Sequence, residues 1–437
     1  MFKKCVVLLA LVVLLGGTLV TASSLVTPTH VGKKDAPISI TMYLLPHYSL
    51  QSTNPVRRKY LEEAYGEWIR KHPDVQVSFQ IISGPAAMSK LLTQARSGTA
   101  PDVAQVDSFV LPRFYDYLQP LDQYFTSNEI DDLLPYCQKG MIHNGHIKGL
   151  WFTTDTRVLY YRKDLIKEPP RTWDDVIRIG KEIKAKYPNM DPFLYPAGKN
   201  EATIICLMPL FWAQGGDLVD STGKPVFNEG KNREYMLNLF RFLKKTVETG
   251  VTPRRVTTYM GEADQNQDVA AGTVAMFIGG NWQVKQIKDL LGTVGLKNWD
   301  VALIPQKSSE MASTGVGGWN WGIFTKDPKK QAVIVDLVNY VYFGSRGMFG
   351  WCSHAGYMPT RKSVYKDYTF YATDPWMQKF LAVMSEGGKP RPGYPIYPTI
   401  STELQVAISS VISGMASPEK ALDTAWRNVM EEYKSMK

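Results

Sequence analysis

The chain has 437 residues, 44% of them hydrophobic and 21% charged, which excludes a disordered protein and allows two domains with separate cores. Its formal net charge is +9, but basic and acidic residues are interspersed, as in the run from Arg57 to Glu63. Such mixing is typical of solvated faces and excludes a nucleic-acid-binding stripe. Aromatic residues make up 12% of the chain, so we expect some Trp and Tyr in a cleft or at a partner interface.

Residues 1–22 are predicted to be an export signal. Lys3 and Lys4 supply positive charge, the stretch from Val6 to Leu15 is apolar, and small residues follow at Ala22. The apolar run is short for a membrane-spanning helix, so we expect cleavage, with an uncleaved N-terminal anchor as the alternative. No lipid-attachment cysteine follows the run. The mature protein is therefore expected to be periplasmic or extracytoplasmic, with a formal charge lowered from +9 to +7 by the loss of both lysines.

Three cysteines remain after this cleavage, namely Cys137, Cys206 and Cys352. Their odd number and wide spacing make a poor disulfide framework, in which at most one bridge can form. We expect none.

Strands and helices alternate in the first part of the mature chain. Strands are expected at 38–44, 75–82 and 103–106, and helices at 57–72 and 88–97. This β-α-β-α-β order predicts a mostly parallel sheet with helices on both faces. Such sheets bind ligands at the carboxyl ends of their strands.

A second α/β stretch begins near Trp151. Its expected elements are a strand at 158–161, helices at 173–187, 201–212 and 234–249, and apolar strands at 274–278 and 301–304. Residues 315–318 are expected to form a glycine-rich connection. From Asp327 the pattern is mainly helical, with a proline-rich loop at 389–398. If the chain were divided into two lobes by a single boundary near residue 150, the strands at 274–278 and 301–304 would have no sheet to join.

Short motifs follow one another in a recognisable order along nearly all of the mature chain. They are Ala100-Pro101-Asp102-Val103, Gly149-Leu150-Trp151, Leu159–Leu165, Pro169–Asp175, Trp212–Gly216, Ala271–Met276, Asn281-Trp282, Gly317–Asn320, Met358–Arg361 and Ser417–Leu422. Each motif is weak alone, but their order and spacing are specific. The chain resembles the family 1 extracellular solute-binding proteins of ABC importers, especially the maltose/trehalose type.

The resemblance implies an α/β fold of the type II periplasmic binding protein class, with two lobes joined by a three-crossing hinge. The crossings would lie near 153–157, 273–277 and 318–324. Lobe one would comprise 36–153 plus 278–320, and lobe two 157–273 plus 322–437. The lobes would close around the ligand by hinge bending.

The resemblance also implies a monomeric receptor, not an enzyme, that delivers a mono- or oligosaccharide to an ABC permease and needs no cofactor. A pyranose ring packs its apolar face on a flat aromatic ring, and its hydroxyls need polar partners once water leaves. Asp107 follows the strand at 103–106, and Asp155 lies at the first expected crossing. Both are candidate hydroxyl acceptors; the alternatives are a helix N-cap for Asp107 and a hinge ion pair for Asp155.

Trp282 and Trp319 are the candidate stacking platforms, with core packing as the alternative for each. Trp321 alternates with Trp319 along a strand and is expected to face the core. Arg391, in the proline-rich loop, would donate to sugar oxygens by resemblance; its alternative is a solvated charge. The remaining candidates are His47 and Tyr48, which stand where the family often has an acidic residue, together with Asn281 and Arg361, of which Arg361 is the more structural.

Two other functions stay open. Carboxylates on either side of a sugar are also a feature of glycosidases, although the sequence identifies no acid/base pair with a raised pKa. The third function is binding of another solute, such as a polyamine or a glycerol phosphate ester. A phosphate would require clustered Arg or Lys, and Asp107 with Asp155 argues against it. His143 and His146 flank Asn144-Gly145, which predicts a hairpin turn and no metal site.

Overall fold

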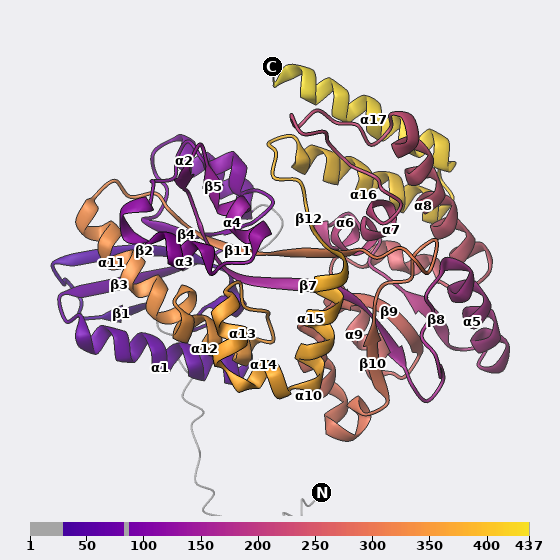
Figure 1. Ribbon diagram of the computed structural model, residues 1–437, viewed down its shortest axis with the longest axis horizontal. Helices are drawn as coiled ribbons and strands as arrows, with labels where there is room; N and C mark the ends of the chain where they lie inside the picture. Colours follow the sequence, from indigo (N-terminus) through magenta and orange to yellow (C-terminus); the bar gives the residue numbers. More distant parts are fainter. Residues whose placement is uncertain (1–28, 83–86, 437) are drawn as a thin grey trace, which may run out of the picture.

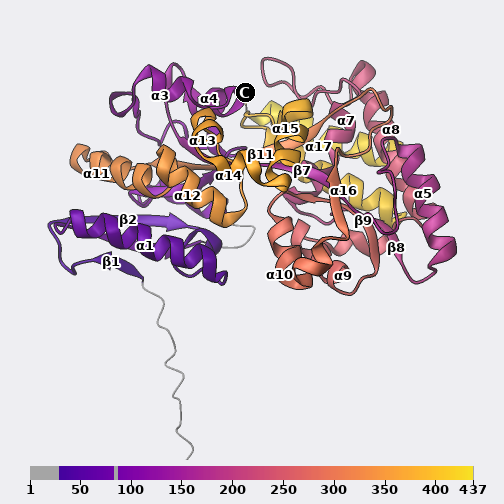
Figure 2. The same ribbon diagram turned by 60° about the horizontal axis from the view of Figure 1, so that its bottom comes forward.

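The computed structural model describes residues 29–82 and 87–436, arranged as two α/β lobes side by side (Figures 1 and 2). The expected export signal at 1–22 lies outside the described residues. One path of hydrogen-bonded strands runs through both lobes in the order β1-β3-β2-β4-β11-β7-β9-β8, with β10 also on β7 and β12 also on β11.

The first lobe contains the amino-terminal strands. They are β1 (His30–Gly32), β2 (Ile38–Leu44), β3 (Val75–Ile81) and β4 (Val103–Asp107). β2 pairs in parallel with β3 and β4, and β4 pairs antiparallel with the second half of β11 (Thr314–Ile323). The helices of this part are α1 (Pro55–Lys71) and α2 (Ala87–Arg96). The expected strands and helices of this region are confirmed to within two residues.

Helix α1 follows from its sequence pattern. Asn54 caps its first turn by accepting from the backbone N–H groups of Val56 and Arg57. Leu61, Tyr65 and Trp68 recur at helical spacing and are fully buried. The apolar stripe of α1 therefore faces the core of the first lobe, while its polar face stays in water.

Helices from the carboxyl-terminal half also belong to the first lobe. They are α11 (Pro328–Val338), α12 (Ser345–Ala355), α13 (Lys362–Asp367) and α14 (Thr369–Thr373). Trp68 of α1 donates to Asp336 of α11 at 2.7 Å, and Tyr60 of α1 donates to Gly347 O of α12 at 3.0 Å. The small elements α3 (Ser127–Asp131), α4 (Pro135–Met141), β5 (Ile142–His143) and β6 (His146–Ile147) complete this lobe. The first three are labelled in Figure 1.

The second lobe is built on the second half of β7 (Leu150–Arg162). β9 (Val274–Gly280) and β10 (Trp299–Ala302) pair antiparallel with it, and β8 (Asp191–Leu194) pairs in parallel with β9. Its helices are α5 (Trp173–Lys186), α6 (Glu201–Leu207), α7 (Pro209–Trp212), α8 (Gly230–Glu248), α9 (Asn266–Ala270), α10 (Gln283–Leu296), α16 (Tyr397–Ser413) and α17 (Pro418–Ser435). The expected helix at 201–212 is divided in two at Met208.

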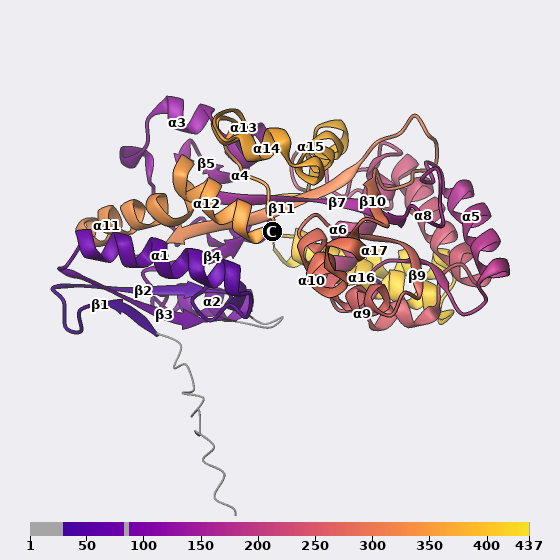
Figure 3. The same ribbon diagram turned by 90° about the horizontal axis from the view of Figure 1, so that it is seen from below.

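The strands β7 and β11 run antiparallel from one lobe into the other (Figure 3). The first expected crossing, near 153–157, falls inside β7. The second, near 273–277, is wrong: β9 pairs with β7 and β8 inside the second lobe. The chain returns to the first lobe along β11 instead.

The expected lobe boundaries are wrong for the same reason. Residues 278–313 lie in the second lobe, and α11 to α14 lie in the first. The chain does not leave the first lobe for the last time near 318–324. It leaves through α15 (Pro375–Gly387), which packs across the connecting strands (Figure 3). The next element, β12 (Gly388–Pro390), pairs with β11. The expectation failed because the sequence of a short apolar strand indicates that the strand pairs within a sheet, but not in which lobe that sheet lies.

The glycine-rich segment at 315–318 is not a connection but part of β11. At Gly318 the backbone has φ 147°, and a Cβ there would lie 1.9 Å from the carbonyl oxygen of Thr153. Glycine is therefore required where β11 passes closest to β7. Thr154 Oγ1 donates to Gly317 O at 2.8 Å and fastens the two strands at the same place.

The structure also bears on the cysteines, on the turn at Asn144-Gly145, and on metal and membrane sites. The three described cysteines are free and buried. Asn144 and Gly145 have positive φ and form the turn between β5 and β6, as expected. Among residues 29–82 and 87–436, no His, Cys, Asp or Glu cluster could hold a metal ion, and no helix is long and apolar enough to span a membrane.

We expect Gly318→Ala to lower the free energy of unfolding by roughly 1–3 kcal/mol or more, because an L-residue is strained at this φ and its Cβ meets backbone. Gly66→Ala in α1 is the matched control, since a Cβ there has room and alanine favours the helix. Denaturant unfolding followed by tryptophan fluorescence measures both. Equal stabilities for the two variants would contradict this account of the crossing.

Candidate functional site

A cavity of about 990 Å³ lies between the lobes, against the connecting strands. The first lobe supplies the start of α1 and the end of β4. The second lobe supplies the starts of α6 and α10 and a short helical segment at Glu262–Gln265. Strands β7 and β11 form its floor. Both lobes and both connecting strands therefore meet at one site.

Six of the nine residues expected to contact ligand line this cavity. They are Asp107, Asp155, Trp282, Trp319, Arg391 and His47. Asp107 is the last residue of β4 and lies at its carboxyl end, where a parallel sheet places ligands. Trp319 is its pairing partner on β11, so the two side chains are neighbours on the sheet.

The other three expected residues do not line the cavity. Tyr48 is fully buried, and its ring stacks on Tyr357 in the core of the first lobe. Asn281 is also fully buried; it accepts from Thr156 N and donates to Gly356 O, so it joins backbone segments near the crossing. Arg361 is 5% exposed and donates to the backbone away from the cavity, in keeping with the structural role considered for it.

Arg391 holds carboxylates of both lobes. Its guanidinium donates to Asp107 at 3.0 Å and to Glu201 at 3.2 Å. Asp107 belongs to the first lobe, and Glu201 begins α6 in the second. Glu201 in turn accepts from Tyr397 at 2.6 Å. The arginine is therefore not a solvated charge but the centre of an ion-pair network that bridges the lobes.

This network shifts the ionisation of its members. Burial raises the pKa of Asp107 to about 6; Arg391 opposes the rise, while the nearby carboxylates of Glu201 and Asp155 add to it. Burial disfavours the charge of Arg391, but Asp107 and Glu201 together raise its pKa above the usual value. The pKa of Asp107 therefore lies closer to neutral pH than that of an ordinary aspartate.

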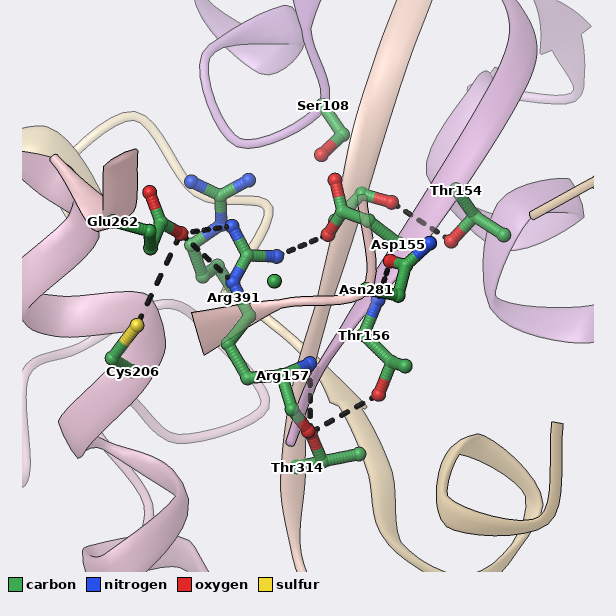
Figure 4. A network of polar contacts seen from close by, with 12 residues as sticks. Ser108, Thr154, Asp155, Thr156, Arg157, Cys206, Glu262, Asn281, Thr314 and Arg391 are labelled. Atoms are coloured by element: carbon green, nitrogen blue, oxygen red, sulfur yellow. Dashed lines mark hydrogen bonds and ion pairs between the residues drawn. The ribbon is translucent and has the colours of Figure 1, made fainter. Parts of the chain in front are cut away.

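A second network lies on the connecting strand β7 (Figure 4). Arg157 donates to Asp155, two residues before it, and to Glu262 at 2.8 and 3.1 Å. Asp155 therefore forms the hinge ion pair that was the alternative for it, while its side chain also lines the cavity. Burial opposes the charge of Arg157, but the two carboxylates raise its pKa.

Aromatic rings form another part of the cavity wall. Trp282 is the N-cap residue of α10, and its ring lies 4.7 Å below the Arg157 guanidinium. Tyr357 lies 5.9 Å from Trp282, centroid to centroid. Trp321 is fully buried against Phe152, as expected, but it shares a face of β11 with Trp319, because residues two apart on a strand point the same way. Flat rings and ionised groups therefore occur together, as recognition of a sugar requires.

Sequence reasoning missed six charged or aromatic residues of the cavity, namely Arg57, Arg157, Glu201, Glu262, Asp289 and Tyr357. Two of them carry a usable signal. Arg157 follows Asp155 by two residues on one strand and so shares its face. Glu201 follows shortly after β8, as Asp107 ends β4, near the carboxyl end of a parallel strand. Glu262 lies in a short helical segment with no periodic pattern.

The raised pKa of Asp107 predicts a pH-dependent stability. The folded carboxyl holds its proton up to about pH 6, whereas the ordinary value is 3.8, so this group favours folding at low pH and loses that contribution as pH rises through 6. We expect the stability of the wild-type protein, relative to Asp107→Asn, to fall by at most about 3 kcal/mol between pH 4 and 7. Urea unfolding across this range measures the difference. Parallel stability curves would contradict the shift.

Comparisons with known proteins agree with this arrangement. Residues 53–343 match the family described as "Bacterial extracellular solute-binding protein". A probable ABC transporter-binding protein of Deinococcus radiodurans is 26% identical, over 82% of this chain and 86% of its own length. The lactose-binding protein of Rhizobium radiobacter is 26% identical, over 64% of this chain and 67% of its own.

Solved structures share the fold. Maltose-bound MalE3 of T. maritima superposes with a TM-score of 0.75 at 24% identity, covering 92% of this chain and all of that one. The GacH receptor of Streptomyces glaucescens gives 0.74 at 20% identity, covering 91% and 97%. These likenesses confirm the expected two-lobed binding-protein fold. The match over residues 53–343 shows that the chain belongs to the bacterial extracellular solute-binding proteins.

Proposed function

We propose that this protein is the extracytoplasmic binding component of an ABC importer, which holds a mono- or oligosaccharide between its lobes and delivers it to the membrane permease. The observation that carries the proposal is the interlobe cavity, where Trp282 and Trp319 stand beside the networks of Asp107 and Asp155. Its volume of about 990 Å³ is at the upper end of ordinary ligand pockets and leaves room for several sugar rings.

The chemistry of the wall supports a saccharide. Apolar ring faces pack on indoles, and carboxylates accept hydroxyl hydrogens in strong charge-assisted bonds. Both kinds of group line one cavity here. The names of the relatives support the same class, since they include a lactose-binding protein and a maltotriose-binding protein of Pyrococcus abyssi, 24% identical over 51% of this chain and 46% of its own length.

The two-lobed form supports the transport role. A ligand that contacts both lobes favours their closed arrangement, and a permease that binds both lobes would recognise that arrangement. Arg391 is the residue best placed to couple the two events, because its partners Asp107 and Glu201 come from different lobes. We propose that the protein acts as a monomer outside the cytoplasm.

One observation favours an enzyme as the second candidate. Asp107 has a pKa raised to about 6, as a glycosidase general acid requires. Against it, Asp107 accepts from Arg391 and Asp155 accepts from Arg157, so an arginine holds each carboxylate. We expect no bond cleavage when the protein is incubated with maltose, trehalose or cello-oligosaccharides. Release of monosaccharide, detected by chromatography, would favour the enzyme.

A thermal-shift panel of saccharides, followed by calorimetry, tests binding. We expect Trp282→Ala and Trp319→Ala each to weaken the best ligand about tenfold or more, because each loses a stacking surface worth on the order of 1 kcal/mol beyond its buried area. Trp376→Ala is the matched control, since Trp376 is a half-buried indole of α15 that does not line the cavity. Unchanged affinity in both cavity variants would contradict the assignment of the platforms.

A further inference from the structure

Arg57 differs from the other two arginines of the cavity. Arg157 contacts Asp155 and Glu262, and Arg391 contacts Asp107 and Glu201. Arg57 has no carboxylate within ion-pair distance in the part of the chain that the structure describes.

The side chain of Arg57 is nevertheless removed from water. The residue is 8% exposed, and it lines the cavity. Nη2 donates to Ala355 O at 2.8 Å, whereas Nε is buried without a partner among residues 29–82 and 87–436. Taking an ion out of water costs several kcal/mol when no opposite charge repays it. Arg57 therefore keeps unused donor capacity in the wall of a cavity that a ligand can enter.

The backbone at the start of α1 adds partial positive charge beside the Arg57 guanidinium. Asn54, Pro55, Val56 and Arg57 form the first turn of the 17-residue helix α1, and all four line the cavity. The positive end of the helix dipole thus points toward this part of the site. Asn54 Oδ1 already accepts from two of the N–H groups, so the guanidinium is the main free donor.

Among the described residues, no neighbouring side chain forms an ion pair with Arg57. Burial, and then Arg57, lower the pKa of His47 to about 4, so His47 is neutral at pH 7. Burial, and then Arg57, also lower the pKa of Lys285 to about 8, which shows a second cation close by. Asp289 lies on the cavity wall but is exposed and bonds to neither. The ring of Tyr357 lies 5.8 Å from the Arg57 guanidinium.

We infer that Arg57, at the start of α1, binds an oxyanion of the ligand, so that the natural ligand is an acidic saccharide carrying a carboxylate or a phosphate. This inference rests on the proposed function. A guanidinium offers the planar pair of donors that fits either group. From sequence alone, Asp107 and Asp155 argued against an anion, but in the structure each is ion-paired with an arginine.

Calorimetry on matched acidic and neutral sugars tests the inference. The pairs are glucuronic acid with glucose, digalacturonic acid with galactobiose, and glucose 6-phosphate with glucose; uronic acids and the phosphate distinguish the two sources of negative charge. We expect at least one acidic member to bind tenfold or more tightly than its neutral counterpart. Raising NaCl from 0.05 to 0.5 M should weaken that acidic member several-fold and leave the neutral one unchanged.

Variants of Arg57 make the test specific. We expect Arg57→Gln to weaken the acidic ligand at least tenfold and the neutral ligand less than twofold, while Arg57→Lys keeps part of the preference. Arg58→Gln is the matched control, because Arg58 is the next residue of α1, is partly exposed and pairs with Glu62. If Arg57→Gln does not fold, the salt dependence of the wild-type protein decides the question.

The outcomes separate this inference from the proposed function. Neutral sugars that bind as tightly as every acidic partner would overturn the anion site and leave the saccharide receptor in place. An equal loss for acidic and neutral ligands in Arg57→Gln would also overturn it, because Arg57 would then be structural. Binding of no saccharide in the panel would overturn both.

Discussion

The antiparallel pairing of β7 with β11 is the constraint on which the rest of this molecule depends. Both strands continue from one lobe into the other, so they join the lobes and also form the floor of the cleft. Their close approach requires glycine at Gly318 and is fastened by Thr154. Asp155, Arg157 and Trp319 project from this shared floor. Bending of the strands would therefore move the ligand-facing groups together with the lobes.

Charge compensation is the second principle of the cleft. Ionised groups are costly to bury unless opposite charges lie beside them, and the cavity meets this requirement with Arg157 and Arg391, each between two carboxylates. Arg57 is the exception, because no carboxylate of the described residues lies within ion-pair distance of it. The specificity of the site is thus a question of which charge the ligand brings.

Local sequence patterns predicted only some of the residues that line the candidate site. Asp107 could be predicted because the carboxyl end of a parallel strand has a known place in a sheet. The neighbours His47 and Tyr48 could not be separated: the first lines the cavity, and the second is buried in the core, since they lie in one short helical turn whose orientation depends on packing. Asn281 and Trp282 divide in the same way at the start of α10.

The sequence by itself determined the strands and helices of the first lobe, the two-lobed family fold and the aromatic and acidic character of the cleft. The elements follow from periodicity and turn residues, which depend on neighbouring residues, and the family fold follows from the order of the motifs along the chain. The tertiary structure alone decided that residues 278–313 join the second lobe and that α11 to α14 join the first. It also decided that Arg57, unlike Arg391, forms no ion pair with an acid in the described part of the chain. Strand pairing and charge pairing join residues far apart in the chain, and no local pattern specifies such partners.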